Sequence, residues 1–101
     1  MPQDNDNDAV MLQQMGDAIT DLEVKFRAAS LEDRMAMRPA IEQLLNDYAD
    51  YRLRLLKEGV ITTRDDLVEM KQIQAQIDAA ASKQDLIKAI ARTAAFVATK
   101  I

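Results

Sequence analysis

Apolar residues recur at alternating three- and four-residue steps in three stretches of this chain. An alternating 3–4 rhythm averages 3.5 residues per repeat, so each stretch predicts a helix with one apolar seam that faces neighbouring helices. The pattern predicts an all-α protein, a helical bundle or coiled-coil-like fold with three long helices. The seams are Leu12, Met15, Ile19, Leu22, Phe26, Ala29; Met37, Ile41, Leu44, Tyr48, Tyr51, Leu55; and Met70, Ile73, Ile77, Ala80, Ile87, Ala91, Ala94, Ala98, Ile101, with Gln84 as a polar exception.

The first helix is expected over residues 9–29. Residues 1–8 are polar and acidic, which predicts a flexible tail, and Asn7 or Asp8 is suited to cap the helix that follows. Residues 9–101 are expected to form a single helical domain. Gly16 falls inside the first helix, where it is either tolerated or required by a close approach of a neighbouring helix.

Pro39 leaves two interpretations of the second helix. Ser30 is a typical cap, and a proline within the helix removes a backbone donor and disfavours helical geometry before it. The favoured interpretation is a short turn over 31–37 and a helix that begins at Pro39; the alternative is one helix over 31–58 with a kink. Gly59 ends this helix, with Val60 packing back against it.

The third helix opens with a capping box at Thr63–Asp66, only about four residues after the second helix ends. So short a connection predicts an antiparallel hairpin of the second and third helices. Ser82 could cap a fourth helix, but no glycine or proline is nearby, and a continuous helix over about 64–99 is favoured. Such a helix would project beyond the others, so its apolar stripe would need another chain.

The composition argues against catalysis. The chain has no cysteine and no histidine, which removes the commonest nucleophile–base pairs and the commonest transition-metal ligands. The acidic run at residues 4–8 resembles the start of a calcium loop, but Ala9 and Met15 stand where that loop needs glycine and glutamate. We therefore expect no enzyme activity, no catalytic residues, no cofactor and no bound metal.

Charge is mild overall, at −4, but unevenly distributed. The first 29 residues are acidic and residues 83–101 are basic, so the two regions are expected to attract each other. The cations Arg52, Arg54 and Lys57 are interspersed with acids, which argues against nucleic-acid binding. Neither a leader peptide nor an apolar run of membrane-spanning length is present, so a cytoplasmic protein is expected.

These features favour a non-enzymatic module for protein–protein interaction or assembly, as a homo-oligomer or as a small adaptor or chaperone. The alternative is a membrane-surface-active protein that works through the amphipathic segment 83–101. The partner is expected to be a protein, either a second copy or a partner helix. The interface is predicted to include the two seam tyrosines and the apolar stripe of the last helix: Tyr48, Tyr51, Ile87, Ile90, Ala94, Val97 and Ile101.

Overall fold

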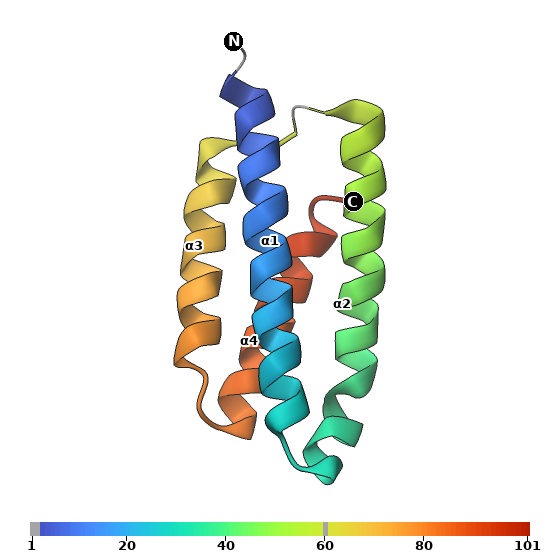
Figure 1. Ribbon diagram of the computed structural model, residues 1–101, viewed down its shortest axis with the longest axis vertical. Coiled ribbons are helices and arrows are strands. Elements are labelled where there is room, and N and C mark those ends of the chain that lie inside the picture. Colours follow the sequence, from blue (N-terminus) through green and yellow to red (C-terminus); the bar gives the residue numbers. More distant parts are fainter. Residues whose placement is uncertain (1–2, 60) are drawn as a thin grey trace.

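The computed structural model describes residues 3–59 and 61–101, with side chains described from Asn7 onward. It contains four helices: α1 (Gln3–Ala28), α2 (Leu31–Glu58), α3 (Arg64–Ala79) and α4 (Lys83–Ala98). They form a compact bundle, and none of the described residues is in a strand (Figure 1). The predicted all-α bundle is therefore confirmed, in its four-helix form.

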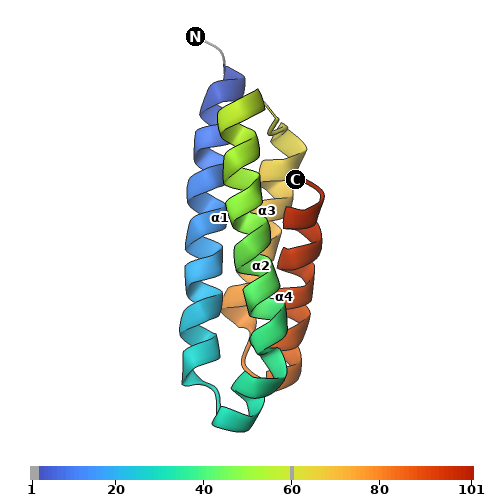
Figure 2. The ribbon, with the colours of Figure 1, turned by 90° about the vertical axis from the view of Figure 1, so that its right-hand side faces the viewer.

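The helices are arranged as a square in which consecutive helices are not always neighbours. α1 packs against α2 and α3, and α4 packs against the same two helices. α2 and α3 occupy opposite corners, and within the described ranges they make no contact. The connection between them crosses the end of the bundle diagonally, so the predicted hairpin of these two helices is wrong (Figures 1 and 2).

The favoured continuous helix over 64–99 is also wrong, because the helix is interrupted at Ala80–Ser82. Ala80 is extended, and the Ser82 hydroxyl accepts a hydrogen bond from the Asp85 N–H at 3.1 Å as the cap of α4. Across the bundle, Lys25 Nζ donates a hydrogen bond to the Ala80 carbonyl at 2.8 Å. This bond satisfies a backbone acceptor that would lack a helical partner at the interruption. By folding back, α4 buries the apolar face that would otherwise project into water.

Pro39 lies inside an uninterrupted α2, so the favoured start of this helix at Pro39 is wrong. The turns that precede the proline bend away from the axis of the rest of α2 (Figures 1 and 2). Such a bend is expected because the ring clashes with the preceding turn and the backbone donor is missing.

The predicted caps of α2 and α3 are confirmed. Ser30 caps α2, Gly59 ends it at φ 59°, and Thr63 and Asp66 form the reciprocal capping box of α3. α1 instead begins at Gln3, inside the expected tail, so Asn7 and Asp8 are within the helix and do not cap it. The predicted packing of Val60 and the side chains of residues 4–6 lie outside the described residues.

The core follows the predicted seams in α1, α2 and α3 but not in α4. The first three seams supply most of the buried side chains, including Met15, Leu22, Leu44 and Ile73. In α4 the inward face is shifted by one residue from the predicted seam, because the connection after α3 resets the rotation of the helix. The buried residues of α4 are Leu86, Ala89, Ile90, Thr93, Phe96 and Val97.

Asp8 fixes the diagonal connection to α1. Its Oδ1 accepts hydrogen bonds from the backbone N–H groups of Ile61 at 3.2 Å and Thr62 at 2.9 Å. Thr62 is buried, so without Asp8 its N–H would lack both water and a protein acceptor. One acidic side chain of α1 therefore satisfies two backbone donors in the connection between α2 and α3.

Candidate interaction surface

Three of the seven predicted interface residues lie in the core of the bundle. Tyr51 and Val97 are fully buried, and Ile90 is 2% exposed. Each would reach a partner only if the bundle opened. For Ile90 and Val97 the prediction depends on a projecting last helix, and the return of α4 to the bundle removes that basis.

Tyr48 is half-buried at the contact between α1 and α2. Its hydroxyl donates to the Leu12 carbonyl at 3.4 Å and lies above Gly16, where an added Cβ would be only 2.9 Å from Oη. The close-approach interpretation of Gly16 is therefore confirmed, with a tyrosine side chain as the approaching group. Tyr48 serves mainly to pack two helices together.

The remaining predicted residues lie at the surface of α4 and just after it. Ile87 is 37% exposed, Ile101 is 48% exposed and Ala94 is partly buried. Ile101 lines a hollow of about 480 Å³ with Leu53 and the polar ends of α2 residues. Arg54 partly closes this hollow, since its Nη1 donates to the Lys100 carbonyl at 2.8 Å.

The more extensive apolar surface lies on the outer side of α2, in a position that the predicted seams did not include. Eight exposed residues repeat there at alternating four- and three-residue steps, and together they are called the outer seam. α2 is about 42 Å long, and Figure 2 shows it in front of the other helices, with its outer side uncovered. The outer seam consists of Leu31, Met35, Arg38, Glu42, Leu45, Ala49, Arg52 and Leu56.

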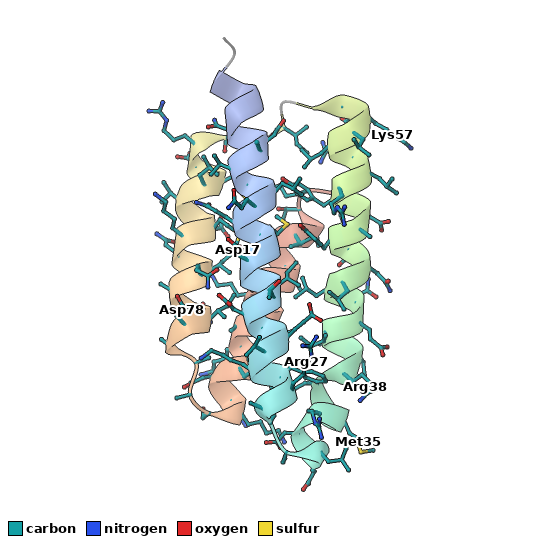
Figure 3. All side chains as sticks on the ribbon, viewed as in Figure 1. Asp17, Arg27, Met35, Arg38, Lys57 and Asp78 are labelled. Atoms are coloured by element: carbon teal, nitrogen blue, oxygen red, sulfur yellow. The ribbon has the colours of Figure 1, made fainter. Side chains whose placement is uncertain are left out.

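The apolar members of the outer seam are strongly exposed. Leu56 is 84% exposed, Met35 66%, Leu31 63% and Leu45 36%. In Figure 3 the side chain of Met35 points away from the bundle. Half of the large apolar side chains that the described residues expose belong to α2, counting Leu53 beside the seam. Exposed large apolar side chains at this spacing on one helix are typical of a contact with another helix.

The charged members of the outer seam have no ionic partner among the described side chains. Arg38 and Glu42 form no ion pair, and Arg52 only lies over the Tyr48 ring at 5.8 Å from its centroid. Figure 3 shows Arg38 directed outward from α2. The pairs that do form lie elsewhere, so these three charges remain available to groups outside the bundle.

A second hollow, of about 390 Å³, lies between α1 and α3 and is lined by acids. Asp21 and Asp78 both accept hydrogen bonds from Gln74 Nε2 at 2.9 Å, which already satisfies them in part. Asp17 and Asp78 are both seen on this side of the bundle in Figure 3. No group of metal-ligating side chains is found in the described part of the chain.

The end of the bundle near the diagonal connection holds two groups with perturbed pKa values. Burial raises the pKa of Tyr51, and the neighbouring Thr62 side chain offsets only part of that rise. Burial opposes ionisation of Asp66, but hydrogen bonds from Lys100 and Thr63 outweigh it and lower the pKa of Asp66. Lys100 Nζ lies 2.6 Å from Asp66 Oδ1. The Asp66–Lys100 ion pair links the start of α3 to the residues that follow α4 at this end of the bundle.

The basic segment 83–101 is engaged within the bundle. Lys83 pairs with Asp33 at 3.3 Å, Lys100 with Asp66, and Arg92 donates to two glutamines of α3. The expected attraction between the acidic front and the basic tail is not used by any ion pair among the side chains from Asn7 onward. None of the described helices is long and apolar enough to cross a membrane.

Comparison with known protein families, curated proteins and solved structures gives no match to this chain. The outer seam is therefore the surface on which a functional argument rests. Its 3–4 spacing is visible in the sequence, but Arg38, Glu42 and Arg52 interrupt the apolar pattern and hide it from a search for apolar residues alone.

Proposed function

We propose that this protein is a non-enzymatic helical module for protein–protein interaction and assembly, and that it binds a helix of another protein chain along the outer seam. The observation that carries the proposal is the exposure of all eight seam residues on a helix whose inner side is already buried in the bundle.

The spacing of the outer seam is suited to a helix rather than to a loop or a small ligand. Steps of three and four residues keep one line of side chains facing a second helix over many turns. Covering such a line removes apolar surface from water, which is worth about 25 cal/mol per Å². The charges at Arg38, Glu42 and Arg52 would then select the partner and its direction.

The membrane-surface alternative has less support. The apolar residues of α4 that the alternative needs, Ile90, Phe96 and Val97, face the core. Two of the four cations in segment 83–101 form ion pairs within the bundle. A membrane helix of this kind would require α4 to leave its neighbours and expose that face.

Photo-crosslinking tests the proposal, because the chain has no cysteine and one introduced thiol is a unique attachment site. A benzophenone on Ala49→Cys lies in the outer seam, and one on Ala95→Cys lies on the exposed side of α4 as a matched control. Each is irradiated as pure protein and in an extract of its native cells. We expect adducts with another protein chain from position 49 only, and their loss when Leu45→Glu is added.

Absence of any protein adduct at position 49, in both pure protein and extract, would contradict the proposal. Equal adducts at positions 49 and 95 would contradict it too, since they would reflect random collision. Co-sedimentation with anionic vesicles separates the alternative: binding that Leu45→Glu leaves unchanged and Lys88→Glu abolishes would favour the membrane.

A further inference from the structure

We infer that the helix bound by the outer seam is α2 of a second copy of this chain, lying antiparallel to the first. The inference rests on the proposed function and names its partner. It places Glu42 opposite Arg52 of the second copy, Leu45 opposite Ala49, and Arg38 opposite Leu56, each contact occurring twice about a two-fold axis.

The seam spacing permits this alignment. In an antiparallel pair of helices, a residue that ends a four-residue step packs in one layer with a partner residue that ends a three-residue step. Glu42 and Ala49 are of the first kind, and Arg52 and Leu45 are of the second. One alignment therefore brings Glu42 to Arg52 and, in the adjacent layer, Leu45 to Ala49.

Charge complementarity selects the antiparallel direction. In a parallel, in-register pair, each charged seam residue would face its own copy: Arg38 on Arg38, Glu42 on Glu42 and Arg52 on Arg52. Every charged layer would then be repulsive. The antiparallel alignment converts two of those layers into Glu42–Arg52 attractions and lets the aliphatic stem of Arg38 cover Leu56.

A second antiparallel alignment, nearer the start of α2, would pair Arg38 with Glu42 of the other copy and Met35 with Leu45. That alignment needs the turns before Pro39, where α2 bends away from its own axis (Figures 1 and 2). The bend separates Leu31 and Met35 from the straight line of the later seam residues. The proposed contact uses the seam residues from Arg38 to Leu56, all but Arg38 of them beyond the proline, and it includes the most exposed leucine.

The three residue pairs, each occurring twice, form six layers of side chains, which is a short interface. Stable dimers bury about 800 Å² per partner, and a single pair of helices over this length covers less, so a dissociation constant of roughly micromolar order is expected.

Sedimentation equilibrium of the full chain, with two charge reversals, tests the pairing. Glu42→Arg places two arginines in each charged layer, and Arg52→Glu places two glutamates there, so each variant alone should dimerise more than about tenfold more weakly than wild type. When the two variants are mixed, every such layer again holds one acid and one base. The mixture should therefore dimerise as wild type does.

Glu69→Arg on the exposed side of α3 is the matched control and should dimerise normally. Association of the mixture also shows that both variants are folded. A wild-type chain that stays monomeric at high-micromolar concentration overturns the inference, while photo-adducts with a different protein at position 49 would leave the proposed function standing. Dimerisation of Arg52→Glu alone, or a mixture that stays monomeric, overturns the alignment.

Discussion

The Tyr48 hydroxyl lies where a side chain on Gly16 would have to be, since a Cβ built at Gly16 would meet Oη at 2.9 Å. The next nearest atom, Cζ of the same tyrosine, would be at an ordinary 3.8 Å. The steric clash would therefore involve only the hydroxyl oxygen of Tyr48. Glycine at this position costs helix stability but allows α2 to place its phenol against the backbone of α1.

This relationship predicts a strongly coupled pair of substitutions. In the wild-type background, Gly16→Ala should change stability little or reduce it. The gain in helix propensity is offset by the cost of displacing the Tyr48 side chain. In a Tyr48→Phe background the same substitution should stabilise by about 1 kcal/mol, the usual difference between glycine and alanine within a helix. Urea denaturation of the four proteins gives the coupling, and equal effects of Gly16→Ala in both backgrounds would contradict it.

Asp8 should be important for stability although it is a surface-type residue near the start of α1. Asp8→Ala leaves two backbone N–H groups of the diagonal connection without their acceptor, one of them buried. We expect a loss of about 1–3 kcal/mol in the free energy of unfolding. Asp17→Ala on the same helix is the matched control and should stay within about 0.5 kcal/mol of wild type. Similar effects of both would show that the connection does not depend on Asp8.

Tyr51→Phe should leave the protein equally stable or stabilise it by about 1 kcal/mol, because the buried hydroxyl has no hydrogen-bond partner among the described groups. The same burial raises the pKa of Tyr51 above 10.0. The folded protein therefore accommodates the neutral phenol better than the phenolate, so stability is unaffected by this group below pH 10 and falls as pH rises through the folded-state pKa. Chemical denaturation at pH 8 and 11 should show a smaller alkaline loss for Tyr51→Phe than for wild type.

Asp66 should make the bundle sensitive to acid. Its pKa is lower in the folded protein than the usual 3.8, so its contribution to stability is present above that pH and is lost as pH falls through the folded value. Lys100→Met removes the hydrogen bond and the charge that help to lower it, so the pKa of Asp66 should rise. NMR titration of the carboxyl carbon measures this shift, and Lys88→Met is a control that should leave it unchanged.

Local signals in the sequence predicted much of the fold. The seams of α1, α2 and α3 and the caps at Ser30 and Thr63 depend on residues close in the chain, and they were read correctly. The interruption between α3 and α4 is not predicted from the sequence, because Ala79–Ala81 favour a helix locally. The contact that stabilises the interruption comes from Lys25, which is 55 residues away from Ala80. The diagonal connection likewise depends on Asp8, a partner 54 residues from Thr62.

The candidate surface was harder to predict than the fold. α4 carries apolar residues on more than one side, so Ile87 and Ile90 fit two different seams, and only packing decides which is buried. The outer seam of α2 was missed because three of its eight members are charged. Charged residues on the surface of a monomer are normally interpreted as facing solvent. Between two paired helices, the same residues determine the relative direction and the alignment of the helices.

Disulfide trapping tests the antiparallel pairing of two outer seams most directly. Single-cysteine variants Leu45→Cys and Ala49→Cys are mixed at high-micromolar concentration and oxidised gently, and mass spectrometry separates the three disulfide-linked dimers because the variants differ in mass. The proposed alignment places position 45 of one copy beside position 49 of the other, so mixed dimers should exceed their statistical share. Two like variants linked as often as unlike ones, or no disulfide beyond that of an Ala95→Cys control, would contradict the pairing.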